Sequence, residues 1–294
     1  MMNLVQLKVL AAVARHGSVT EAAKELHYSQ PSVSHHLARL EAATGARLMQ
    51  KVGRGIRLTP EGRLLADRAA EIVGRVEAAS RELSAQVDLH AGRVRLASNA
   101  SPLSTVVPQA IAALGQAHPG INVSLVDSHP AESMEMLRRG EVDVAVVFRH
   151  VGAPAEEHGF RLVHLCDDPI YLISRKKDDA LDKHRDTAWI GGCDRCQAEL
   201  YAVCRRLDFA PRIDCLSDDM VVVQSMVAAG AGVTILPGLA LRAHRRPDVQ
   251  ATELAGCHRQ IFAATYGDPP DPPAVAAVLT ALREAAAVRS TTGR

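Results

Sequence analysis

The stretch GSVTEAAKELHYSQPSVSHHLARLEAATG, residues 17–45, decides how the N-terminal part of this chain of 294 residues folds. Ser18 precedes Glu21 with the spacing of a capping box, which predicts the start of a helix. A turn follows at residues 27–29, and Pro31 then stands in the first turn of a second predicted helix, where its missing N–H costs least. Two short helices joined by a tight turn are typical of a helix-turn-helix motif.

The second predicted helix has an apolar face and a polar face. Val33, Leu37 and Leu40 form the apolar face, which we expect to pack on an earlier helix around residues 4–14. The polar face offers donors and acceptors that suit base edges and phosphates in a major groove. The residues expected to contact DNA from this helix and its start are Ser29, Gln30, Pro31, Ser32, Ser34, His35 and Arg39. A three-helix core with a solvated polar face is the alternative interpretation.

Residues 51–58, KVGRGIRL, predict two short extended pieces around a glycine turn, the pattern of a β-wing. Arg54 and Arg57 are the wing cations that we expect at the DNA backbone or in the minor groove. Residues 1–60 carry eight lysines and arginines against three acidic side chains, so the net charge of +1 leaves the rest of the chain acidic. A basic head on an acidic body suits a module that binds a polyanion.

A long helix is predicted directly after residues 1–60. Thr59, Pro60 and Glu61 form a strong helix start. Apolar residues then recur at alternating spacings of four and three, at Leu65, Ala69, Ile72, Val76, Ala79 and Leu83. Such a seam predicts a linker helix over residues 61–90 that pairs with a second copy of the chain. A long helix that packs on its own domain is the alternative.

From residue 91 to residue 294 short apolar runs alternate with helical stripes. Runs at 94–97, 121–126 and 142–148 are separated by two predicted helices, and a second set of elements begins at residue 170. This βαβαβ succession predicts an α/β domain with a mostly parallel sheet. We expect two Rossmann-like subdomains, the first about 91–165 with 266–294 and the second about 166–265.

Residues 1–90 resemble the N-terminal part of the LysR-type transcriptional regulator family of bacteria. The resemblance rests on the order and spacing of LVQL at 4–7, GSVTEAA at 17–23, SQPSVS at 29–34, LE at 40–41, GARL at 45–48 and LTPEG at 58–62. It implies a winged helix-turn-helix, with Gln30, Pro31 and Ser34 at the DNA and Arg54 in the wing. His35 stands where many relatives carry Arg, so operator preference does not carry over.

The segment at 228–237 also resembles the family, and it extends the resemblance over nearly the whole chain. The resemblance implies a periplasmic-binding-protein-like domain that senses a metabolite in a cleft between two subdomains. Ligands of open α/β sheets bind beyond the carboxyl ends of the strands. The residues expected there are Ser98, Asn99, Ser101, Ser128, His129, Phe148, Arg149, Cys193 and Asp194. Since Arg149 would supply a fixed positive charge, we expect an anionic effector. Capping or turn roles are the alternative for these side chains.

Cys193 and Cys196 are the one local pair that can carry thiol chemistry. Arg195 and a following helix N-terminus would both favour a thiolate. A thiol-based redox sensor is therefore an alternative function, beside inert reduced thiols, which are expected for six irregularly placed cysteines without an export signal. A zinc site would need two more ligands, so no metal is expected.

The sequence contains no Walker-type phosphate loop, Gly-x-Ser-x-Gly elbow or His-Glu-x-x-His pair, so we expect neither an enzyme nor a cofactor. Residues 220–241 are uncharged, but three glycines and Pro237 predict a buried helix and strand rather than a membrane span. Without a signal peptide the expected location is the cytoplasm.

The expected function is that of a sequence-specific transcriptional regulator that binds double-stranded DNA and a small-molecule effector. We expect a homodimer or, as the family implies, a homotetramer built as a dimer of dimers, which contacts RNA polymerase. A ligand-independent architectural DNA-binding protein is the alternative from another class.

Overall fold

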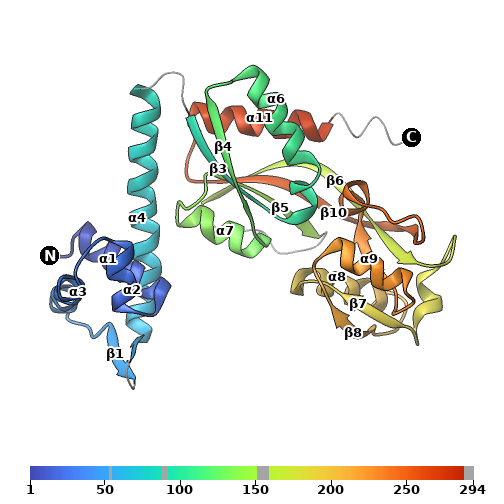
Figure 1. The fold of residues 1–294 in the computed structure, drawn as a ribbon, viewed down its shortest axis with the longest axis horizontal. Coiled ribbons are helices and arrows are strands. Elements are labelled where there is room, and N and C mark those ends of the chain that lie inside the picture. The colour runs from blue at the N-terminus through green and yellow to red at the C-terminus, as the bar shows by residue number, and fades with distance from the viewer. Residues whose placement is uncertain (53–54, 88–91, 151–158, 288–294) are drawn as a thin grey trace. The chain divides into compact units, whose positions relative to one another are not determined.

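The computed structural model describes residues 1–52, 55–87, 92–150 and 159–287. The chain divides into two compact units, one made of residues 1–90 with 135–142 and the other of residues 91–134 with 143–294 (Figure 1). Within the described ranges, none of the helices has the length and apolar character that crossing a membrane requires.

The N-terminal unit begins with three short helices, α1 (Leu4–His16), α2 (Val19–Glu25) and α3 (Gln30–Thr44). The hydroxyl of Ser18 caps α2 and that of Ser29 caps α3, each accepting a hydrogen bond of 3.3 Å from the amide three residues on. Gly45 ends α3 in the left-handed conformation, with φ of 69°. The helix-turn-helix predicted from the sequence is thus present in the structure.

The wing is a short hairpin of β1 (Met49–Val52) and β2 (Gly55–Leu58), which pair antiparallel. The carboxylate of Glu41 in α3 accepts hydrogen bonds from the amides of Leu48 (2.8 Å) and Met49 (3.2 Å). Leu48 is fully buried in the helical core with Leu37 and Leu40. The hairpin is therefore anchored to the helix that carries the predicted DNA contacts.

The linker helix α4 (Pro60–Val87) starts with a cap in which the Thr59 hydroxyl accepts from the Gly62 amide at 2.9 Å. A Cβ at Gly62 would lie 2.0 Å from the carbonyl oxygen of Leu48, so only glycine fits there. The predicted seam divides into two parts. Ala69 is buried against α1, whereas Ile72, Val76 and Leu83 are 42, 41 and 69% exposed. The first residues of the apolar seam thus pack in the core of the N-terminal unit itself.

The C-terminal unit is built on a mixed sheet of six strands in the order β4-β3-β5-β10-β6-β9. The strands are β3 (Gly92–Ser98), β4 (Ile121–Asp127), β5 (Val144–His150), β6 (Phe160–Ser174), β9 (Thr234–Pro237) and β10 (Gln250–Tyr266). β3 runs parallel to β4 and β5, whereas β10 runs antiparallel to β5 and β6, and β6 to β9. The expectation of a mostly parallel sheet was wrong, because β6 and β10 cross between the two lobes in opposite directions.

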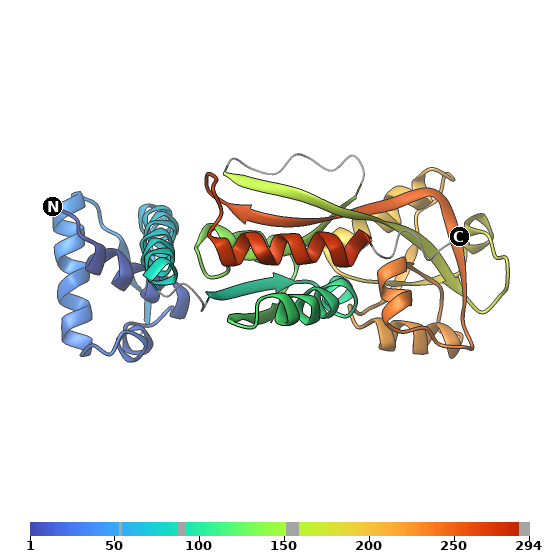
Figure 2. The same cartoon turned by 90° about the horizontal axis from the view of Figure 1, so that it is seen from above.

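Helices cover the sheet at one lobe. α6 (Val106–Ala117) and α11 (Pro273–Ala287) lie side by side in both views (Figures 1 and 2), next to the one-turn helix α5 (Ala100–Leu103). Val107 and Leu282 from these helices are fully buried against Leu96 and Ile261 of the sheet. α7 (Pro130–Arg138) connects β4 to β5.

The other lobe contains the parallel pair β7 (Ala188–Gly191) and β8 (Arg212–Leu216) with a 3-10 turn at Leu181–His184. The helices α8 (Asp194–Arg205) and α9 (Met220–Ala228) complete it, while α10 (Gly238–Ala243) buries Leu239 in the core of the first lobe. Trp189, the only tryptophan of the chain, is fully buried in the core of this second lobe. The two-lobed α/β fold expected from the sequence is confirmed.

Candidate functional site

One face of α3 is polar and open to solvent. Val33, Leu37 and Leu40 hold the opposite face in the core with at most 1% exposure. Among the residues predicted to contact DNA, those exposed on this face or at its start are Ser29, Gln30, Pro31, Ser34, His35 and Arg39. Ser32 is half-buried, and its amide donates to the Ser29 cap. The face is therefore available to a groove.

Two further side chains lie beside this face. Arg57 is exposed on β2, whereas Arg54 lies outside the described residues. Tyr28, in the turn before α3, is 43% exposed, and its ring centroid is 5.9 Å from that of His36. From the sequence, Tyr28 was predicted only as a turn residue. An exposed aromatic ring beside a polar helix face is nevertheless a signal of a contact surface.

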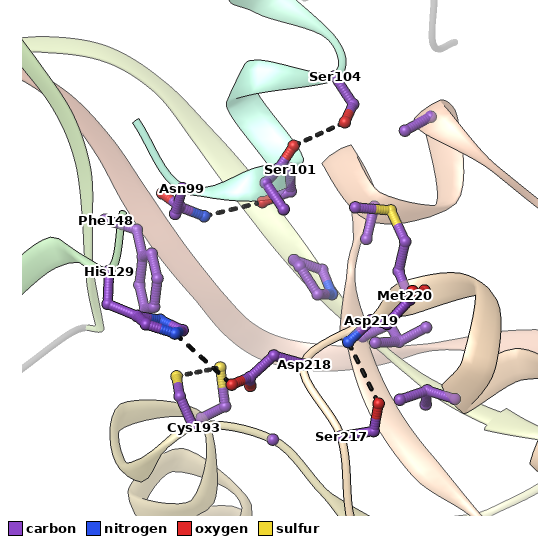
Figure 3. Close-up of a pocket in the computed structure, with 18 of the residues that line it drawn as sticks. Asn99, Ser101, Ser104, His129, Phe148, Cys193, Ser217, Asp218, Asp219 and Met220 are labelled. Atoms are coloured by element: carbon purple, nitrogen blue, oxygen red, sulfur yellow. Dashed lines mark hydrogen bonds and ion pairs between the residues drawn. The ribbon is translucent and has the colours of Figure 1, made fainter. Parts of the chain in front are cut away.

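A cavity of about 700 Å³ opens between the two lobes of the C-terminal unit (Figure 3). The residues predicted for effector binding that line it are Asn99, Ser101, Ser128, His129, Phe148 and Cys193. Three predicted residues do not line it. Ser98 is fully buried, Asp194 is exposed in the first turn of α8, and the Arg149 guanidinium lies 6.0 Å from the centre of the Phe262 ring.

The cation in the cavity wall is Arg259 of β10, which the sequence analysis did not select. Its side chain is 4% exposed and lies 4.5 Å from the centre of the Phe148 ring. Nε and Nη2 donate to Oδ2 of Asp168 at 2.9 and 2.8 Å, and Nη2 also donates to Oγ of Ser101 at 2.6 Å. A buried guanidinium is thus held by a buried carboxylate and a hydroxyl of the cavity wall.

Asp168 joins this network to α10. Its side chain is completely buried, and Oδ1 accepts a hydrogen bond of 2.8 Å from the amide of Leu239 in α10. Ser101 belongs to α5, while Asp168 and Arg259 belong to the crossing strands β6 and β10. One continuous set of hydrogen bonds therefore joins α5, the two crossing strands and α10 at the cavity.

Acidic side chains gather on the other parts of the cavity wall. Asp127, Glu132, Asp218 and Asp219 all line it. Asp219 caps α9 by accepting from two amides at 2.8 and 3.1 Å. Asp218 lies 3.6 Å from Nε2 of His129, and Figure 3 shows these two side chains pointing toward each other above the cysteine pair.

The two cysteines predicted for thiol chemistry are neighbours in the cavity wall. Their sulfur atoms are 3.3 Å apart, at the start of α8. Hydrogen bonds from the Cys196 thiol and amide lower the pKa of Cys193 to about 6 against the opposing effect of burial, whereas the same contact and burial raise the pKa of Cys196. Arg195 does not act on the thiols as expected, because its guanidinium donates to the carbonyl of Phe148 at 3.3 Å. Within the described ranges, no three His, Cys, Asp or Glu side chains are grouped to hold a metal.

His150 and Glu199 form a partly buried contact of 3.3 Å between Nδ1 and Oε2. Burial and the charges of Arg259 and Arg195 lower the pKa of His150 to about 4. Burial raises the pKa of Glu199. The imidazole is therefore uncharged near neutral pH, and the contact contributes no full ion pair.

Charged residues inside apolar strands are the signal that would have found the floor of the cavity. Asp168 interrupts an apolar run and Arg259 precedes one, and a buried charge must be paired. The sequence alone does not say with which residue, since the two are far apart along the chain.

Comparison with known proteins identifies the family. Residues 4–63 match the model of the bacterial regulatory helix-turn-helix protein, lysR family, and residues 88–287 match the LysR substrate binding domain. The chain belongs to the LysR family. It is a LysR-family transcriptional regulator with an effector-binding domain.

Among LysR relatives, the HTH-type transcriptional regulator TfdS of Cupriavidus pinatubonensis is 30% identical over 278 residues, which cover 88% of this chain and 90% of that protein. The RuBisCO operon transcriptional regulator of Acidithiobacillus ferrooxidans is 29% identical over 252 residues, covering 82% and 79%. These relatives carry the names of transcriptional regulators.

Solved LysR-family structures share the fold over nearly the full length. CbnR superposes with a TM-score of 0.69 at 23% identity, covering 97% of this chain and 99% of that one. Full-length OxyR from Pseudomonas aeruginosa superposes with a TM-score of 0.70 at 19% identity, covering 96% and 95%. The LysR fold assigned from the sequence is confirmed.

Proposed function

We propose that this LysR-family protein binds specific operator sequences through α3 and the wing, and that a small molecule in the cavity of the C-terminal unit modulates its activity. The observation that carries the DNA-binding part is the exposed polar face of α3, held in place by a buried apolar face. Base edges in a major groove are read by such donors and acceptors, while Arg57 suits a phosphate contact.

Binding to labelled fragments of the protein's own upstream region, with excess unrelated DNA and at several salt concentrations, tests this proposal. His35→Ala should weaken the specific complex by about fivefold to a hundredfold, as expected for a lost base contact. Arg57→Ala should weaken all complexes and reduce the salt slope by about one. Arg245→Ala removes an exposed positive charge from the other unit and should leave binding unchanged.

Equal affinity for every fragment would contradict operator recognition and would favour an architectural DNA-binding protein instead. In that case His35→Ala would be silent, and only the salt dependence of phosphate contacts would remain.

The buried network supports effector control. A ligand that hydrogen-bonds Ser101 contacts the same hydroxyl that Arg259 uses, and Arg259 is tied through Asp168 to the amide of Leu239. Ligand binding would therefore act on the crossing strands β6 and β10 and on α10 through these hydrogen bonds. It would shift the protein between states only if its affinity differs between them.

Two partners complete the proposed mechanism. The exposed apolar residues of α4, Ile72, Val76 and Leu83, suit a helix of a second copy, giving a dimer and, in the family's manner, a dimer of dimers. Effector-dependent placement of the DNA-binding units would then alter contact with RNA polymerase.

A second candidate function, redox sensing, is favoured by the 3.3 Å separation of the Cys193 and Cys196 sulfur atoms. The Cys193 thiolate attacks hydrogen peroxide, the O–O bond breaks, and hydroxide leaves while Cys193 becomes a sulfenic acid. Cys196 then attacks that sulfur, a disulfide forms, and the oxygen leaves as water with the thiol proton. The sulfur atoms need to approach to about 2 Å.

Thiol counting before and after peroxide treatment tests the redox candidate. The wild-type protein should lose two thiols, Cys193→Ser should lose none, and Cys215→Ser, a half-buried cysteine elsewhere in the unit, should behave as wild type. Loss of two thiols in Cys193→Ser would contradict the assignment.

A further inference from the structure

The charges around the cavity differ from those that a simple anion would require. Four carboxylates line it, whereas Arg259 is the one lysine or arginine among its lining residues, and Asp168 already balances that charge. A small dianion placed there would meet more negative than positive charge. A purely anionic effector, expected when Arg149 was placed in this cleft, therefore fits poorly.

We propose that the effector is an amphoteric small molecule, with a carboxylate or comparable acceptor group at the Arg259 end of the cavity and a protonated amine at the Asp218 end. This inference rests on the proposed function, because it assigns the chemical class of the ligand that the cavity would take.

The Arg259 end offers hydrogen-bond donors. Nε and Nη2 of Arg259 are engaged by Asp168 and Ser101, whereas Nη1 donates to no described residue. Asn99 adds a carboxamide beside Ser101, with its amide nitrogen 3.2 Å from Oγ and its buried oxygen without a partner among the described residues. A buried group in this state is costly unless a ligand or water completes its hydrogen bonds. A ligand carboxylate can accept from Nη1 of Arg259, while a bound water can donate to Oδ1 of Asn99.

The Asp218 end offers acceptors. Among the described residues, Asp218 has one side-chain partner, His129 at 3.6 Å, and the cavity-lining Asp127 and Glu132 have no ion-pair or hydrogen-bonding side-chain partner. Gly192 packs closely against the Asp218 side chain, because a Cβ at residue 192 would lie 3.2 Å from Oδ1 of Asp218. An ammonium group provides the three donors that such carboxylates lack.

Apolar side chains also line the cavity. They include Phe148, Met220, Ile235 and Leu236, and they suit a short carbon chain better than a polar linker. The cavity volume of about 700 Å³ accommodates a metabolite of this kind.

The test measures thermal stabilisation and calorimetric binding of the full chain with four matched series of probes. These are amino carboxylates from glycine to aminohexanoate, monocarboxylates from acetate to hexanoate, dicarboxylates from oxalate to adipate, and alkylamines from methylamine to hexylamine. At one chain length or more, the amino carboxylate should bind at least about tenfold more tightly than the three probes of equal length.

Variants at each end locate the probe. Asp218→Asn should weaken the amino carboxylate by about tenfold and leave the monocarboxylate unchanged, while Ser101→Ala should weaken both. Asp214→Asn is the matched control, because Asp214 is an exposed carboxylate on β8 that pairs with Arg212 and does not line the cavity.

Tighter binding of dicarboxylates, no binding by any series, or an amino carboxylate affinity unchanged in Asp218→Asn would each overturn the inference. Operator binding measured on the same preparations separates this failure from failure of the proposed function. If the protein recognises its operator but shows no preference for the amine, only the proposed ligand class is overturned. If it does not recognise its operator, the proposed function is overturned.

Discussion

Replacing Asp168 by asparagine tests the buried network directly. The change keeps the shape of the side chain but removes the charge that balances Arg259, whose guanidinium is 4% exposed. Breaking a buried ion pair from one side costs about 3–5 kcal/mol, because the remaining charge stays desolvated. Asparagine can still accept from the Leu239 amide, so we expect the lower limit, about 3 kcal/mol. For a domain of this size that corresponds to a melting temperature about 6–12 °C lower.

The assay is urea or thermal unfolding followed by tryptophan fluorescence. Trp189 is the only tryptophan and is fully buried in the C-terminal unit, so the signal reports that unit alone. Asp167→Asn is the control, because that neighbouring carboxylate is 58% exposed and, among the described residues, pairs with His164 alone; its effect should stay within about 0.5 kcal/mol. The double variant Asp168→Leu with Arg259→Met should recover most of the loss. Wild-type stability of Asp168→Asn would refute the reasoning.

Three further predictions concern other parts of the chain. The rate of Cys193 alkylation by iodoacetamide should rise with pH through a midpoint near 6, where the thiol becomes a thiolate, and the midpoint should move toward 9 in Cys196→Ala, measured by mass spectrometry. The pKa of His150 is about 4 in the folded protein and 6.5 for the free side chain, so the unfolded chain binds more protons between these two pH values. The free energy of unfolding should therefore fall as the pH drops from 6.5 to 4. In unfolding experiments His150→Gln should reduce this fall by up to about 3 kcal/mol. Replacing both Ile72 and Val76 by aspartate should convert a dimer to a monomer in light scattering, and an unchanged mass would refute pairing through α4.

The sequence predicted those parts of the fold in which local signals agree. Ser18, Ser29 and Pro31 mark helix starts, and the structure places helices α2 and α3 at those positions. The run at 94–97 and its successors likewise became strands of the sheet. In these segments capping, periodicity and burial all favour the same element, so no tertiary information is needed.

The crossing strands were harder to predict because tertiary contacts override their local pattern. Asp167, Asp168 and Pro169 look like a break, yet β6 continues through them for 15 residues. The polar interruption is tolerated because Asp168 finds Arg259 on the paired strand, 91 positions away in the sequence. A sequence without aligned relatives carries no signal for that partner, so the floor of the cavity and its cation were both missed.

The importance of tertiary pairing also explains why only part of the candidate site could be predicted from the sequence. Ser101, Ser128 and Cys193 follow strand ends, where the position of a ligand is a general property of α/β sheets. Arg149 was expected to follow such an end as well, but it lies within β5, which pairs with β10, and its side chain lies at Phe262 and does not line the cavity. The position of a residue along a strand predicts the end of the sheet it occupies, whereas pairing and burial decide which cation faces the ligand. Because Asp168 already neutralises Arg259, that cation can orient a ligand without attracting every anion. The carboxylates that line the cavity then discriminate among the possible ligands.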